Sequence, residues 1–248
     1  MLEGIQIALI LGLLGLFAHI VKGLTGFGPA IVFVSIGSLF YEPIEIIVLA
    51  SILDVVGGAY LLLLNPDFLR NKEYWVPLGM LMVIGAVSGS YILSILSASL
   101  FEYFFGTAIV IISLWFLSGR SELDKDSEGT HKLGFIDGFV GIFSGFCGGF
   151  VGMGGPPIVA YLGNKFDKEL FRAIIVPVFM MAATSRVFSY SYLGMVNTGN
   201  ILIYLFPPIG AIIGNHIGNH FFEDVQQKWF TVIIGVILML SGIRLLIG

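Results

Sequence analysis

Two glycine-rich segments, each followed by proline, are the parts of this sequence best suited to bind a ligand. Glycine lets the main chain approach a ligand closely, and proline suits the first turn of a helix. A helix that begins at such a proline presents free N–H groups and a partial positive charge, which favour an anion. We therefore predict two backbone anion sites, formed by Thr25, Gly26, Phe27, Gly28 and Pro29 in the first segment and by Gly152, Met153, Gly154, Gly155 and Pro156 in the second.

A single arginine lies well inside an apolar segment of the second half of the chain. Arg186 would be costly within a membrane, so its presence there suggests a function. It is a candidate to bind the anion directly, and the alternative is a structural ion pair with Asp54; the two roles are compatible. Ser185 and Ser189 are close enough to Arg186 on a helix to form a polar path beside it.

The histidines suggest a second, weaker set of roles. His19 precedes Lys22 by one helical turn and lies near the first glycine segment, so its ring is a candidate for a coupling proton or a donor to the anion. The alternative is that it only reaches the membrane interface, where we also place Asp137. His216 and His220 have the i, i+4 spacing of metal ligands but no third ligand nearby, so we favour a helix–helix contact and predict no metal site.

The composition places these residues in a membrane. Of 248 residues, 57% are hydrophobic and 11% are charged, whereas a soluble domain has about 25% charged residues. The mean hydropathy of +0.98 and the repeated long apolar runs predict an all-α polytopic membrane protein in contact with the lipid bilayer. We predict neither an enzyme nor a cofactor, because no catalytic triad or nucleotide loop is present, and no nucleic-acid partner, because no basic patch is present.

The sequence consists of two related halves. We place the first repeat at 1–118, a hydrophilic linker at 119–132 and the second repeat at 133–248. Repeats that each contain several spans are typical of secondary transporters. The aligned residues are mostly glycines, and outside the glycine–proline segments we expect these glycines to pack helices. Gly12, Gly15, Gly23, Gly26 and Gly28 align with Gly138, Gly141, Gly149, Gly152 and Gly154, and Gly85, Ala86 and Gly89 align with Gly210, Ala211 and Gly214.

The distribution of lysine and arginine predicts how the repeats are oriented. If 24–41 and 151–164 both cross the membrane, ten of the eleven basic residues outside the span interiors, Lys22 among them, fall on one side; if neither crosses, the residues divide five against six. We therefore expect five spans in each repeat, inverted topology, and broken helices at the glycine–proline motifs. The linker 119–132 is then cytoplasmic and both termini are outside. The expected spans are 4–22, 24–41, 44–64, 76–97, 100–118, 133–150, 151–164, 170–192, 199–220 and 226–247.

The second glycine–proline motif and the residues after it resemble a known family. The stretch from Gly152 to Leu162 is similar to the sulfite exporter TauE/SafE family of membrane permeases, and so is the stretch from Gly210 to Leu246, with its Gly-Ala-x-x-Gly pattern. The resemblance covers nearly the whole chain. It implies a cell-membrane permease for a small anion such as sulfite, a sulfonate, or another sulfur-containing or organic acid anion.

Together these features predict a secondary transporter that moves a small anion by alternating access. An anion channel on the same scaffold is the alternative. The residues leave open which anion is moved, in which direction, with which coupling ion and in which oligomeric state.

Overall fold

The computed structural model describes residues 2–117, 134–162, 165–166, 168–197, 199 and 201–221, and these ranges form ten helical elements. The linker 119–132 and the expected span 226–247 lie outside the described residues. The elements are α1 (Leu2–Thr25), α2 (Pro29–Gly37), α3 (Pro43–Leu64), the 3-10 helix η1 (Pro66–Arg70), α4 (Lys72–Ile95), α5 (Ala98–Leu117), α6 (Phe135–Val151), α7 (Gly155–Leu162), α8 (Lys168–Tyr192) and α9 (Leu202–His220).

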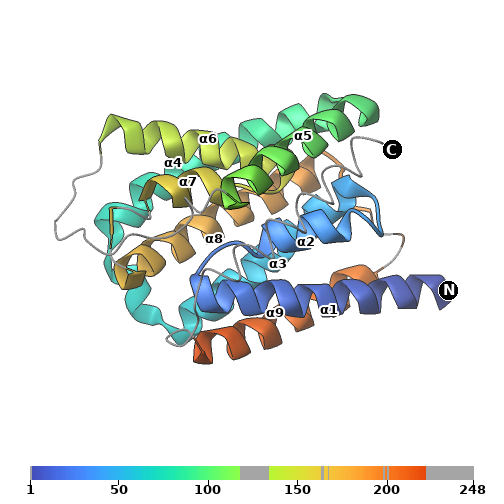
Figure 1. The fold of residues 1–248 in the computed structure, drawn as a ribbon, viewed down its shortest axis with the longest axis horizontal. Coiled ribbons are helices and arrows are strands. Elements are labelled where there is room, and N and C mark those ends of the chain that lie inside the picture. The colour runs from blue at the N-terminus through green and yellow to red at the C-terminus, as the bar shows by residue number, and fades with distance from the viewer. Residues whose placement is uncertain are drawn as a thin grey trace.

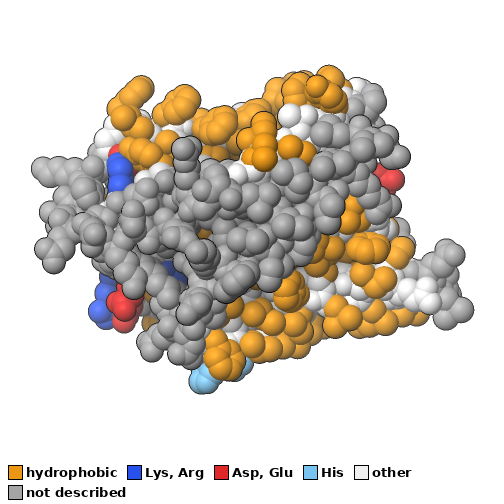
Figure 2. Space-filling model, viewed as in Figure 1, with side chains coloured by type: hydrophobic (Ala, Val, Ile, Leu, Met, Phe, Trp, Pro, Cys, Tyr) orange, Lys and Arg blue, Asp and Glu red, His pale blue; other side chains and the backbone are white. Residues whose placement is uncertain are grey.

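Four of the described helices are long and apolar enough to cross a membrane, namely Gly4–Thr25, Pro43–Leu64, Lys72–Ile95 and Glu169–Tyr192. At 1.5 Å per residue, 22 helical residues extend about 33 Å, which matches the hydrocarbon thickness of a bilayer. Figure 2 shows apolar side chains over the flanks of the molecule, with the charged side chains in view gathered toward its ends. The chain is therefore an all-α multi-pass membrane protein.

The helix boundaries fall at the two glycine–proline motifs. Helix α1 ends at Thr25 and α2 begins at Pro29, while α6 ends at Val151 and α7 begins at Gly155. Between them, Gly26, Gly28 and Gly152 have φ angles of +83°, +87° and +78°, a conformation that side chains disfavour. The expected spans 24–41 and 151–164 thus contain helices of only nine and eight residues. Each extends about 12–14 Å, which is less than half of a bilayer core.

The longest helices pack in pairs that join the two halves of the chain. In Figure 1, α1 runs beside α9 along one edge of the molecule, and α6 runs beside α4 near the other edge. Backbones touch in both pairs: a Cβ atom on Gly210 would overlap the carbonyl oxygen of Gly12, and a Cβ atom on Gly85 would overlap that of Ile142. Small residues allow this close approach, as is usual where membrane helices pack.

Helices α3 and α8 lie in the interior between these pairs. Helix α3 packs against α2, α8 and α9, and α8 packs against α3 and α4. Their central side chains are buried, from Ile46 to Leu53 in α3 apart from the partly exposed Ile52, and from Phe171 to Val178 in α8. A buried polar side chain on either helix is far from water and needs a partner within the protein. Asp54 and Arg186 are on these two helices.

The close contact between α4 and α6 predicts a difference between two glycine substitutions at the same interface. Gly85→Ala should lower the midpoint of thermal unfolding, because its Cβ atom meets the backbone of Ile142, which cannot turn aside, at a cost of about 1–3 kcal/mol. Gly141→Ala is the matched control, because its Cβ atom would lie 3.6 Å from the side chain of Leu81, an ordinary contact. Thermal unfolding of the detergent-solubilised variants measures both, and equal midpoints would contradict the packing.

Candidate functional site

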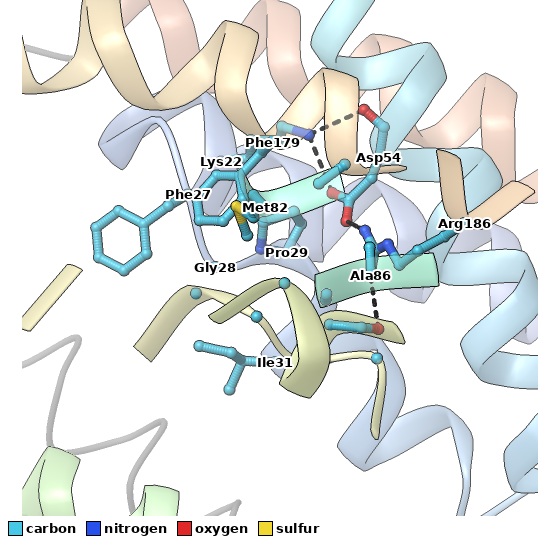
Figure 3. Close-up of a pocket in the computed structure, with 17 residues that line it drawn as sticks. Lys22, Phe27, Gly28, Pro29, Ile31, Asp54, Met82, Ala86, Phe179 and Arg186 are labelled. Atoms are coloured by element: carbon cyan, nitrogen blue, oxygen red, sulfur yellow. Dashed lines mark hydrogen bonds and ion pairs between the residues drawn. The ribbon is translucent and has the colours of Figure 1, made fainter. Parts of the chain in front are cut away.

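The two glycine–proline segments meet at one buried cavity. The first segment lines it with Phe27, Gly28 and Pro29, and the second with Gly152, Gly154 and Gly155 (Figure 3). The cavity has a volume of about 20 Å³, which is room for one water molecule. The remaining lining residues are Lys22, Ala30, Ile31, Asp54, Met82, Ala86, Gly145, Gly148, Phe179, Ala182 and Arg186.

Two cations share one carboxylate in the wall of this cavity. The Nζ atom of Lys22 lies 3.0 Å from Oδ1 of Asp54, and Nη2 of Arg186 lies 3.0 Å from Oδ2 (Figure 3). The side chains of Lys22, Asp54 and Arg186 are 1%, 9% and 5% exposed, so solvent does not screen their charges. Asp54 is the single carboxylate among the described residues that line the cavity. The cluster therefore has a surplus of one positive charge.

Helix α8 holds the last turn of α6 beside the cavity. Arg186 Nη1 donates a hydrogen bond to the carbonyl oxygen of Gly148 at 3.1 Å, and the hydroxyl of Tyr190 donates one to that of Gly149 at 2.8 Å. On the other side of the motif, the Ser144 hydroxyl donates to the carbonyl oxygen of Gly154. The carbonyl groups at the end of α6 have no partners within the helix, so these donors satisfy them and fix the second glycine segment.

The first glycine segment is held in a similar way. Arg172 on α8 donates from Nη2 to the carbonyl oxygen of Gly23 at 2.8 Å and to Oδ1 of Asn219 at 2.7 Å. The Thr25 hydroxyl accepts the N–H of Phe27 at 3.2 Å and donates to the carbonyl oxygen of Val21 at 2.9 Å. Each of the two arginines of α8 thus binds a carbonyl group near the end of a helix, Arg172 at α1 and Arg186 at α6.

The predicted site residues divide into two groups. Besides the glycine–proline residues already named, Asp54 and Arg186 line the cavity, and the ion pair expected as an alternative for Arg186 is present. Thr25 and Gly26 shape the turn without lining the cavity. Met153 is 1% exposed and packs in the hydrophobic core, and Pro156 is not part of the lining.

Ser185, which was predicted to form a polar path beside Arg186, does not line the cavity that Arg186 lines. Ser185 lines a separate, mostly apolar cavity of about 390 Å³ together with residues such as Met180 and Phe188, and its hydroxyl donates to the carbonyl oxygen of Ala182. Consecutive residues on a helix point about 100° apart, so Ser185 and Arg186 face different cavities. Ser189 lines neither of these cavities.

Lys22 is a site residue that was not predicted, because its place at the end of the expected span 4–22 put it with the basic residues of the cytoplasmic side. Helix α1 continues to Thr25, since no residue before Gly26 stops it, and its last turns are buried. Lys22 therefore lies inside the protein. The spacing of three residues from His19 was the available signal, because it places both side chains on one face of a helix. Arg172, near the start of α8, is likewise buried.

Two further predictions were wrong about exposure. His19 is 1% exposed, so it does not reach the membrane interface. Asp137 is 3% exposed; its Oδ2 accepts the N–H of Gly134 at the start of α6, and its Oδ1 pairs with Lys165 at 2.8 Å. Partial burial lowers the pKa of Lys165, but its hydrogen bonds with Asp137 and Tyr161 outweigh this, so its pKa lies above the ordinary value.

His216 makes a contact between two helices. Its Nδ1 atom lies 2.9 Å from the hydroxyl of Tyr60, which joins α9 to α3 as expected. Within the described residues, no group of three or more histidine, cysteine or acidic side chains is arranged to hold a metal ion.

Comparison with family models identifies the kind of protein to which this site belongs. A model described as sulfite exporter TauE/SafE matches residues 11–245. The chain belongs to the sulfite exporter TauE/SafE family. No curated protein and no solved structure matches it in the corresponding comparisons. Membership confirms the resemblance expected from the motifs and implies a multi-pass membrane transporter for sulfur-containing anions.

The charge cluster of this TauE/SafE transporter predicts a clear order of stability among three variants. Asp54→Asn should lower the free energy of unfolding by about 3–5 kcal/mol, because it leaves two buried cations without a counter-charge. Lys22→Met should have a much smaller effect, because Asp54 keeps its pair with Arg186. Arg186→Met should be intermediate, because it also releases the carbonyl oxygen of Gly148. Thermal unfolding in detergent measures the order of stability. Equal losses of unfolding free energy for Asp54→Asn and Lys22→Met would contradict the sharing of one carboxylate by two cations.

Proposed function

We propose that this protein is a secondary transporter that binds a small sulfur-containing or organic acid anion, such as sulfite or a sulfonate, in the cavity between Lys22 and Arg186. The surplus positive charge of the cluster is the observation that carries the proposal. A buried charge without a partner is costly in a membrane protein. An anion in the cavity would complete the neutralisation that Asp54 alone leaves incomplete, and a cation would be repelled.

Backbone groups of both glycine–proline segments support the same ligand. The first four N–H positions of a helix have no partner within the helix, and proline has no N–H. At the start of α2 this leaves Gly28, Ala30 and Ile31 as donors, all of which line the cavity. At the start of α7, Pro156 and Pro157 have no N–H, so only Gly154 and Gly155 are donors. We infer that the two segments bind the anion unequally, with more donors from the first.

The size of the cavity favours a transporter over a channel. A volume of about 20 Å³ holds one water molecule, so an anion with several heavy atoms enters only after the surrounding helices move. A transporter requires such a movement in each cycle, whereas an open channel requires a continuous path. We therefore favour alternating access, in which one repeat rearranges against the other, and keep the anion channel as the alternative.

We further propose that the repeats are inverted and that each provides five transmembrane elements. Two features of the packing support this: α1 with α9 and α4 with α6 are corresponding pairs formed between halves, and Arg172 and Arg186 bind corresponding ends of α1 and α6. Two exposed basic residues, Arg70 at the end of η1 and Lys72 at the start of α4, lie near the place where Arg172 of α8 packs over Phe68 of η1. This agrees with a cytoplasmic location for that end and for the linker 119–132, with both termini outside.

Removing the surplus charge should weaken anion binding while the fold remains intact. Lys22→Met leaves the balanced pair of Asp54 and Arg186, and we expect the affinity for the anion to fall roughly 10- to 100-fold, a loss of about 1.4–2.8 kcal/mol of binding free energy. Lys72→Met is the matched control, since Lys72 is exposed at the start of α4.

A thermal-shift screen of the purified proteins against sulfite, thiosulfate, sulfate, methanesulfonate and short carboxylates measures this effect, because a ligand stabilises the folded state. We expect at least one of these anions to stabilise the wild type and the Lys72→Met variant but not the Lys22→Met variant. Stabilisation of neither the wild type nor the control by any of them would contradict the anion site.

Flux measurements separate the transporter from the channel. Proteoliposomes loaded with the anion that the screen selects should accumulate labelled anion against its gradient by exchange, which a channel cannot do at zero membrane potential. Arg186→Met and Gly154→Leu should each reduce this flux at least tenfold. The first variant removes a cation from the cavity wall, and the second places a large side chain on a glycine of that wall. Rapid equilibration without accumulation would favour the channel, and unchanged flux in both variants would contradict the assigned site.

A further inference from the structure

His19 is buried next to the charge cluster, and its ring has an unusual set of neighbours. Its Nδ1 atom lies 3.0 Å from the carbonyl oxygen of Gly15, and its Nε2 atom lies 3.2 Å from that of Leu53. A carbonyl oxygen only accepts hydrogen bonds, and a neutral imidazole has a single N–H. Both contacts are therefore hydrogen bonds only when the ring carries two protons, so the surroundings of His19 fit the imidazolium ion.

Asn215 on α9 faces the same small space. Its side chain is fully buried, and within the part of the chain that the structure describes neither its amide oxygen nor its amide nitrogen has a hydrogen-bond partner. A Cβ atom on Gly57 would lie 2.5 Å from Nδ2 of Asn215 and 2.9 Å from Nε2 of His19, so the absence of a side chain at Gly57 gives room to both. A buried amide without hydrogen-bond partners costs free energy. This cost indicates that Asn215 has a partner whose hydrogen-bonding groups change.

An amide is suited to a neighbour that gains and loses a proton. Its NH₂ group donates to the lone pair of a neutral imidazole, while its oxygen places a partial negative charge beside a charged ring whose two N–H groups bind Gly15 and Leu53. Asn215 can therefore stabilise either state of His19 by turning its amide group. The amide group of Asn215 is a dipole without a net charge, so it adds no further charge to the cluster.

We propose that His19 and Asn215 form a proton-binding site that couples proton uptake to anion binding, an inference that rests on the proposed anion transport. Two charged groups interact with His19, namely Lys22 from α1 and Asp54 from α3, and Arg186 from α8 pairs with the same Asp54. From α9, the titratable His216 contacts Tyr60 instead. The charge cluster has a net charge of +1 with neutral His19 and +2 with protonated His19, so an anion in the cavity favours the proton, and by linkage the proton favours the anion.

Proteoliposomes that contain a pH-sensitive dye test this coupling with two anions that do not titrate near neutral pH, thiosulfate and methanesulfonate. An inward gradient of a transported anion should carry about one proton inward per anion, and the lumen should acidify. His19→Gln should retain anion uptake down its gradient but lose the acidification and the accumulation driven by an imposed pH gradient. His216→Gln is the matched control and should behave as the wild type, because His216 lies outside the site.

The outcomes separate the coupling from the transport itself. Anion uptake by the wild type without proton movement would overturn the proton site and leave the proposed transport intact. Absence of uptake of both anions would overturn the proposed function and the coupling with it. If His19→Gln does not fold, two readouts decide: the proton-to-anion ratio of the wild type, and the pH profile of Asn215→Leu. We expect the midpoint of that profile to shift by at least one pH unit, and an unchanged midpoint would contradict the role of Asn215.

Discussion

The shared use of one carboxylate by two buried cations is the interaction on which the rest of this structure depends. Lys22, Asp54 and Arg186 come from α1, α3 and α8, and each would be costly to bury alone in a membrane protein. Their mutual attraction fixes the relative positions of three helices. Because two cations share one carboxylate, the cavity wall has a net positive charge. The same three side chains therefore stabilise the fold and determine the charge of the site.

Glycine allows the helices to come close enough for this arrangement. Side chains on α4 and α6, or on α1 and α9, would separate the backbones at Gly85 and Gly210. Two other glycines, Gly26 and Gly152, adopt positive φ angles directly after α1 and α6 and end these helices inside the protein rather than at its surface. Packing and helix termination therefore use the same residue type for different physical reasons, and both bring main-chain groups to the cavity.

The parts of the site that follow from local sequence rules could be predicted, and those that depend on tertiary packing could not. The glycine–proline motifs give helix boundaries from backbone geometry alone, and the cost of a buried charge suggests a partnership between Arg186 and Asp54. Lys22 was misplaced because the exact end of α1 decides whether it lies in a loop or in the interior. Ser185 was misplaced because its direction on α8 depends on which neighbours pack there. Nothing in the sequence singled out Asn215, whose significance comes only from the position of Gly57 and His19 around it.

Anomalous diffraction from crystals of the protein grown with selenite, the selenium analogue of sulfite, tests the central claim most directly. The surplus charge of Lys22 and Arg186 predicts a selenium peak in the cavity between these two side chains and the starts of α2 and α7, in a conformation where the cavity has widened. A peak at another position within the membrane-spanning helices, with the cavity empty and Asp54 still bound to both cations, would contradict it.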